Sequence, residues 1–90
     1  MLADAGRGDW VLCQVTSKSY ADVNAVGINE ADFAQGSLRL ASFARPGKLF
    51  TANAGLIEGN LGVLQREALR RIVNAVIAVI GASSVTEVDA

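Results

Sequence analysis

The spacing of apolar residues changes once along this chain of 90 residues, and that change constrains the fold more than any other feature. Before residue 66, apolar residues come in short runs or alternate with polar ones, which is typical of β-strands. From Arg66 to Ile80 they recur every three or four positions, as on one face of an amphipathic helix. The chain is therefore expected to form several short strands followed by one C-terminal helix, a mainly β fold of the α+β class.

Turn residues divide the β region into short segments. Trp10–Thr16 is an almost continuous apolar run, expected to be a strand that is buried on both faces and flanked by other strands. The glycine-rich residues 3–9 before it are interpreted as a turn. Residues 42–45 alternate in polarity and lead to Pro46-Gly47, so a hairpin is expected there, with a second strand starting at Lys48. A shorter strand is expected around Ala25–Ile28.

The C-terminal helix has the clearest pattern. Its buried face is predicted to comprise Leu69, Ile72, Val73, Val76, Ile77 and Ile80. Gly81 is expected to cap its C-terminal end. Residues 1–81 are therefore expected to form a single domain, and residues 82–90 a disordered tail.

The composition excludes several classes of function. The chain has no histidine and a single cysteine, Cys13, so no intramolecular disulfide can form and no metal site is expected. Its longest apolar stretch, at residues 72–80, is too short to cross a bilayer, and its first residues lack the pattern of a signal peptide. We therefore expect a cytoplasmic protein with no cofactor and no membrane association.

Hydrophobicity and charge indicate the kind of partner. Hydrophobic residues make up 51% of the chain, which is high for so short a domain. Because a small core alone is marginally stable, a homodimer that covers apolar surface is expected. The net charge of −1 argues against binding polyanions through the field of the whole protein, so any nucleic-acid contact would need a local cationic patch.

Three stretches, taken in order, resemble the MazF/PemK family of toxin endoribonucleases. They are GDWVLCQVTSKSYAD (8–22), DFAQGSLRLASFARPGKLFTAN (32–53) and LGVLQREALRRIVNAVIAVI (61–80). The resemblance implies an SH3-like barrel that forms a homodimer and ends in a helix. It also implies the toxin component of a type II toxin–antitoxin pair, an enzyme that cleaves single-stranded mRNA without metal. A cognate antitoxin protein would cover the RNA-binding surface.

The chain departs from the family pattern at its start. Members begin with a strand of the GDI-V type, a basic loop and an RPALVL strand, whereas residues 1–10 here match only the end of the last of these. The arginine before that proline, which the family is thought to use in catalysis, has no counterpart. The alternative function is therefore a truncated, catalytically impaired relative that dimerises or binds an antitoxin. A misassigned start codon is a third possibility, and whether the chain is an enzyme stays open at this stage.

The resemblance also implies the site residues. Metal-free RNA cleavage needs cations and hydroxyl donors around the phosphate, because negative charge develops there in the transition state. Arg45 and Thr16 are the expected catalytic residues, since a guanidinium can hold two phosphate oxygens and a hydroxyl can donate to one. Further residues are expected to bind RNA: Ser17, Lys18, Tyr20 and Lys48.

Each of these residues also has a plainer interpretation. Arg45 and the lysines fit solvated side chains at the rim of the sheet, and Thr16 and Ser17 fit a strand end at which hydroxyls bond the local backbone. No general base is assigned, because some relatives carry an aspartate where this chain has Gly47. Asp22 is interpreted as a solvated turn residue.

Overall fold

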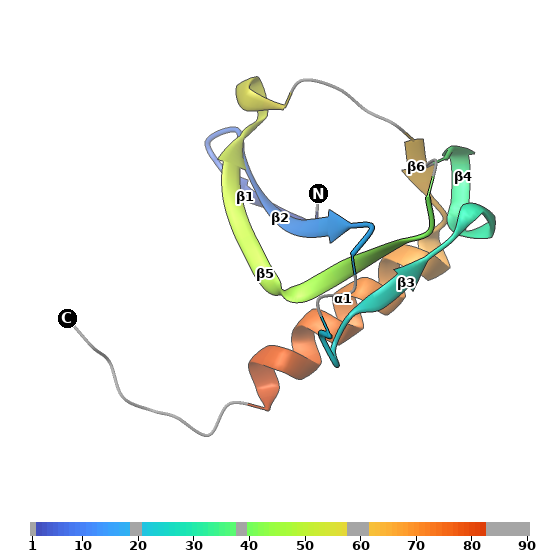
Figure 1. Ribbon diagram of the computed structural model, residues 1–90. Coiled ribbons are helices and arrows are strands. Elements are labelled where there is room, and N and C mark those ends of the chain that lie inside the picture. Colours follow the sequence, from blue (N-terminus) through green and yellow to red (C-terminus); the bar gives the residue numbers. More distant parts are fainter. Residues whose placement is uncertain (1, 19–20, 38–39, 58–61, 83–90) are drawn as a thin grey trace.

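The computed structural model describes residues 2–18, 21–37, 40–57 and 62–82. Within them the fold is mainly β, with a curved half-barrel sheet and one C-terminal helix, as expected (Figure 1). The elements are β1 (Ala3–Gly6), β2 (Asp9–Thr16), β3 (Val26–Ile28), the 3₁₀ turn η1 (Glu30–Asp32), β4 (Phe33–Gly36), β5 (Ser42–Asn53), the 3₁₀ turn η2 (Ala54–Leu56), β6 (Gly62–Leu64) and α1 (Arg66–Gly81).

The main sheet has four antiparallel strands in the order β1-β2-β5-β3, and β4 pairs with β6 in a separate ladder. As expected, β2 lies between two other strands. The prediction that β2 is buried on both faces is wrong, because almost every β2 side chain is only half-buried and Val15 is exposed. The strand expected around Ala25–Ile28 is confirmed as β3.

The hairpin expected at Pro46-Gly47 is wrong. β5 runs without interruption from Ser42 to Asn53 and bends sharply, and both of its halves pair with β2 (Figure 1). Cys13 pairs with Leu49 and the next residue, Gln14, pairs with Arg45, so the three residues between Arg45 and Leu49 form a bulge. A proline cannot donate to the ladder, and a bulge is a place where a strand tolerates one. Pro46 is fully buried there.

Residues 3–9 form a strand and a tight turn, where only a turn is expected from the sequence. β1 pairs with the start of β2, and Arg7 and Gly8 form the two-residue connection with φ of +56° and +79°. Positive φ at both central residues is typical of a type I′ turn, in which Asn-Gly is strongly preferred. Arg7 is thus an L-residue in the left-handed region, where its Cβ is unfavourable.

Arg7→Asn is therefore expected to raise the free energy of unfolding by about 0.5–1 kcal/mol, since asparagine tolerates the left-handed conformation. Urea denaturation monitored by circular dichroism measures the change. Arg7→Ala is the matched control, because it also removes the guanidinium but lacks the short polar side chain through which asparagine tolerates this conformation. Equal stability of the Asn and Ala variants would contradict the argument.

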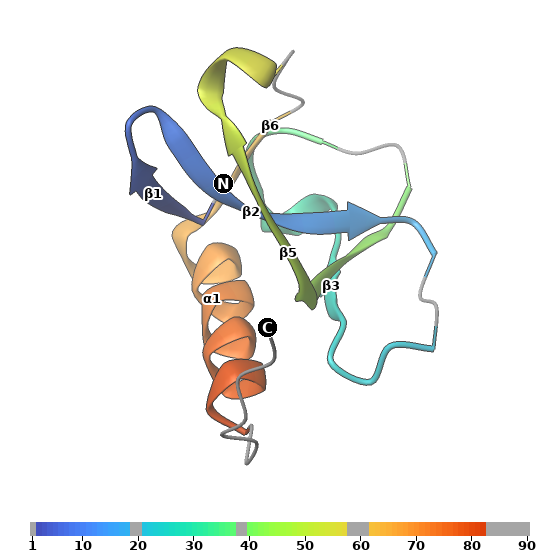
Figure 2. The same cartoon turned by 90° about the vertical axis from the view of Figure 1, so that its left-hand side faces the viewer.

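The helix packs on one side of the sheet, mainly against β5 and β3 (Figure 2). Its first residue is confirmed, and its buried face runs along Ala68, Ile72 and Val76. Ile72 packs with Ile28 and Ala44 to form the core. Ile77 and Ile80, also expected on this face, are 61% and 64% exposed.

The helix ends one residue later than expected, because Gly81 is still helical and Ala82 is the C-cap. Ala82 has φ of −79°, so the helix end does not need a glycine in the left-handed conformation. Residues 83–90, most of the expected tail, lie outside the described residues.

Candidate functional site

The bend in β5 places Arg45 beside the end of β2. Arg45 lies directly opposite Gln14, and Thr16 lies opposite Phe43, two residues before Arg45. Paired residues of antiparallel strands share a face, as do residues two apart on one strand. Arg45, Gln14 and Thr16 therefore point to the same face of the sheet, with Arg45 and Thr16 as diagonal neighbours.

Asp22 and Gln14 both bond the guanidinium of Arg45. Its Nε donates to Oδ2 of Asp22 at 3.1 Å, and its Nη1 donates to Oε1 of Gln14 at 3.2 Å. The side chains of Arg45 and Asp22 are 19% and 14% exposed. Asp22 is therefore an ion-pair partner rather than the solvated turn residue expected from the sequence.

The other carboxylate oxygen of Asp22 is engaged by the backbone. Oδ1 accepts from the N–H of Asn24 at 2.9 Å, and the N–H of Ala25 closes the turn by donating to the carbonyl of Asp22 at 3.1 Å. The bond from Asn24, followed by the bond from Arg45, lowers the pKa of Asp22 below its ordinary value. The carboxylate is therefore ionised throughout the neutral range.

The neighbouring hydroxyl is only partly committed. Oγ1 of Thr16 accepts from the N–H of Lys18 at 3.1 Å, as in the local strand-end turn that the sequence left open. A hydroxyl that accepts one bond still has its own proton to donate, so Thr16 is able to contact an anion on this face. Ser17 and Lys18 follow it and are exposed, whereas Tyr20 lies outside the described residues.

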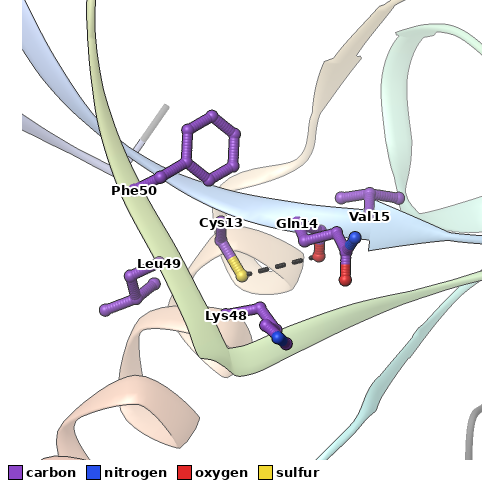
Figure 3. A pocket seen from close by; sticks show the side chains of 6 residues that line it. All are labelled: Cys13, Gln14, Val15, Lys48, Leu49 and Phe50. Carbon is purple, nitrogen blue, oxygen red and sulfur yellow. Dashed lines mark hydrogen bonds between the residues drawn. The ribbon is translucent and has the colours of Figure 1, made fainter.

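A shallow hollow of about 460 Å³ is lined in part by Gln14, the residue that bonds Arg45 (Figure 3). It is lined by Cys13, Gln14, Val15, Lys48, Leu49 and Phe50. The hollow is mostly apolar. Lys48, an exposed residue of the bulge, brings a positive charge to it, and the half-exposed ring of Phe50 follows two residues further along β5. Lys48 is the last residue of the bulge, so Pro46 and Gly47 separate it from Arg45 in the chain. Gln14 lines the hollow with Lys48 and also bonds Arg45.

The lone thiol in this hollow is not suited to act as a nucleophile. Sγ of Cys13 lies 3.2 Å from the carbonyl oxygen of Arg45, to which it donates a hydrogen bond. Burial raises the pKa of Cys13 above its ordinary value. The group is therefore a neutral thiol at physiological pH, and the thiolate is the reactive form.

Three members of this arrangement were not predicted from the sequence. Gln14 gives no signal in an apolar run, and Asp22 in a polar loop looks like a turn former. Phe50 could have been found, because it stands two residues after Lys48 on one strand and so shares its face. Of the predicted residues, the structure brings Arg45 and Thr16 onto one face of the sheet and places Lys48 at the end of the bulge.

Comparisons with known proteins do not assign the chain. No protein-family model matches it, and a search of the curated proteins finds no significant match either.

Among the residues that the structure describes, no group of cysteine, aspartate and glutamate side chains is arranged to hold a metal ion. The helices within the described ranges are all too short or too polar to cross a membrane.

Proposed function

We propose that this chain is a toxin of the MazF/PemK type, a metal-independent endoribonuclease that cleaves single-stranded mRNA in the cytoplasm. The proposal builds on the three sequence stretches that resemble the family in order, and it fits a mainly β fold with a curved sheet and a C-terminal helix. The observation that carries it is the common face of Arg45 and Thr16, a cation and a hydroxyl beside a hollow with Lys48 and Phe50.

The proposed reaction uses the RNA's own 2′-hydroxyl. The 2′-oxygen attacks phosphorus, the bond from phosphorus to the 5′-oxygen breaks, and the proton released from the 2′-hydroxyl is balanced by one delivered to the leaving oxygen. Arg45 would stabilise the negative charge on the phosphorane oxygens, and Thr16 would donate to one of them. The products are a 2′,3′-cyclic phosphate and a 5′-hydroxyl.

The residues around Arg45 would contact the rest of a single-stranded RNA. Ser17 and Lys18 lie exposed beyond Thr16, and Lys48 adds a further cation at the end of the bulge. The exposed ring of Phe50 offers a stacking surface, and stacking contributes about 1–3 kcal/mol per base. Cationic side chains combined with an aromatic stacking surface are typical of proteins that bind single-stranded nucleic acid.

The proposal extends to assembly. An SH3-like barrel of this family would be a homodimer, and this chain leaves several large apolar side chains exposed, among them Phe50, Ile77 and Ile80. A cognate antitoxin protein would block activity by covering the face that holds Arg45 and Thr16.

One observation favours the alternative, a catalytically impaired relative that dimerises or binds an antitoxin. The guanidinium on which the reaction depends is engaged by Asp22 and Gln14, and none of the described carboxylates is assigned as a general base. Such a protein would bind RNA weakly or not at all and would leave it intact.

Incubation of the purified protein with 5′-labelled single-stranded RNA in EDTA tests the proposal. We expect fragments that end in a cyclic phosphate, and no cleavage of the same sequence with 2′-O-methyl riboses, because methylation removes the nucleophile. RNA that stays intact at micromolar protein would reject the nuclease and favour the binding module. Cleavage of both RNAs would indicate a different mechanism or a contaminating enzyme.

A further inference from the structure

The ion pair between Arg45 and Asp22 joins a candidate phosphate-binding group to a carboxylate of the same chain. We propose that Asp22 is a built-in competitor that occupies the phosphodiester position on Arg45 and must leave it when RNA binds. This inference rests on the proposed function, because it takes the phosphodiester of RNA as the incoming anion. It adds a regulatory residue that the family resemblance does not assign.

The geometry carries the proposal. Oδ2 of Asp22 accepts from Nε of Arg45 at 3.1 Å, which is a position that a phosphate oxygen would occupy on the same donor. Gln14 holds Nη1 independently of Asp22, at 3.2 Å. The guanidinium can therefore keep its orientation on β2 while its anionic partner is exchanged.

The two partners of Arg45 differ in how they are anchored. Gln14 is a strand residue opposite Arg45 in the sheet, whereas Asp22 belongs to the turn at 21–25 before β3. The turn is exposed at Val23 and Asn24, and its first residue, Ala21, has φ of +53°. A left-handed alanine is unfavourable, so the turn that carries Asp22 holds local backbone strain, which a rearrangement of the turn would be able to release.

Charge gives the direction of the effect. An ionised carboxylate at this position repels an incoming phosphate and also uses one of the donors that the phosphate needs. The apparent dissociation constant for RNA therefore contains the cost of breaking the ion pair, and removing the carboxylate charge removes that cost. Asparagine at position 22 keeps the size of the side chain and an oxygen for the N–H of Asn24.

Asp22→Asn is expected to bind a short 2′-O-methyl RNA about three- to tenfold more tightly than the wild type at pH 7, measured by fluorescence anisotropy. Asp4→Asn is the matched control. Asp4 also accepts a backbone N–H two residues on, from Gly6 at 2.7 Å, and its substitution changes the net charge equally. Binding by Asp22→Asn that is no tighter than binding by Asp4→Asn would overturn the proposal.

A measurement on the wild type decides the matter even if Asp22→Asn fails to fold. In a titration with inorganic phosphate followed by NMR, the Nε–H of Arg45 and the backbone N–H of Asn24 are expected to shift with one midpoint, because Asp22 links them. A shift of Arg45 with Asn24 unchanged would reject the exchange. Neither measurement uses RNA cleavage. If the protein exchanges Asp22 for phosphate but leaves RNA intact, the proposed nuclease activity is wrong and the inference about Asp22 stands.

Discussion

Ile72→Ala is expected to lower the free energy of unfolding by about 2–5 kcal/mol, enough to leave much of this small domain unfolded. Ile72 is 3% exposed and packs against Ile28 and Ala44, which are 4% and 0% exposed. Both neighbours are held in the sheet, so relaxation closes only part of the cavity left by the three missing carbon atoms.

The same substitution five residues along the helix is the matched control. Ile77 is 61% exposed, so Ile77→Ala removes the same atoms with little loss of burial, and we expect a change below about 1 kcal/mol. Urea denaturation of both variants at one protein concentration measures the two effects. Equal losses at the two positions would mean that the helix does not present Ile72 to the sheet.

The outcome for the helix shows what periodicity can and cannot predict. The 3.6-residue period predicted the start of α1 correctly, because an apolar stripe of this length fits no other regular element. It also placed Ile77 and Ile80 on the buried face, where the structure has them exposed. A stripe shows which residues avoid water but does not show how far along the helix the sheet extends to cover them.

The bend at Pro46 illustrates a different limit. A proline followed by glycine favours a turn between two strands, but the same residues also suit a bulge within one strand. The choice depends on which strand the second half of β5 pairs with. Both halves pair with β2, whose residues lie 27 to 44 positions earlier in the chain than their partners, and no local pattern contains that information.

The candidate site, too, was predictable from the sequence only in part. Arg45 and Thr16 came from the family resemblance, and the sheet register brings them onto one face. The pairing of Arg45 with Asp22 was not predictable, because it joins residues 23 positions apart through a turn that begins with a left-handed alanine. Alanine carries no signal for that conformation, since only the surrounding structure imposes it.

Arg45→Ala is expected to lower the first-order rate constant for RNA cleavage by about 100- to 1,000-fold, the usual effect of losing one preorganised donor at a developing charge. Arg45→Lys should recover part of the loss, because an ammonium retains the charge but not the planar fork of donors. Arg70→Ala, which removes an exposed arginine from α1, is the matched control and should cleave at the wild-type rate. Single-turnover assays with excess protein separate this step from product release.

A double variant distinguishes contact with the phosphate from a merely structural role. Arg45→Ala leaves the carboxylate of Asp22 without its partner at a 14% exposed position, which could by itself disturb the turn and the site. Arg45→Ala combined with Asp22→Asn removes that unpaired charge. If Arg45 serves only to neutralise the charge of Asp22, the double variant should cleave faster than Arg45→Ala by most of the lost factor. If Arg45 stabilises the phosphorane, the double variant should remain as slow as Arg45→Ala, because neither asparagine nor alanine can replace the guanidinium.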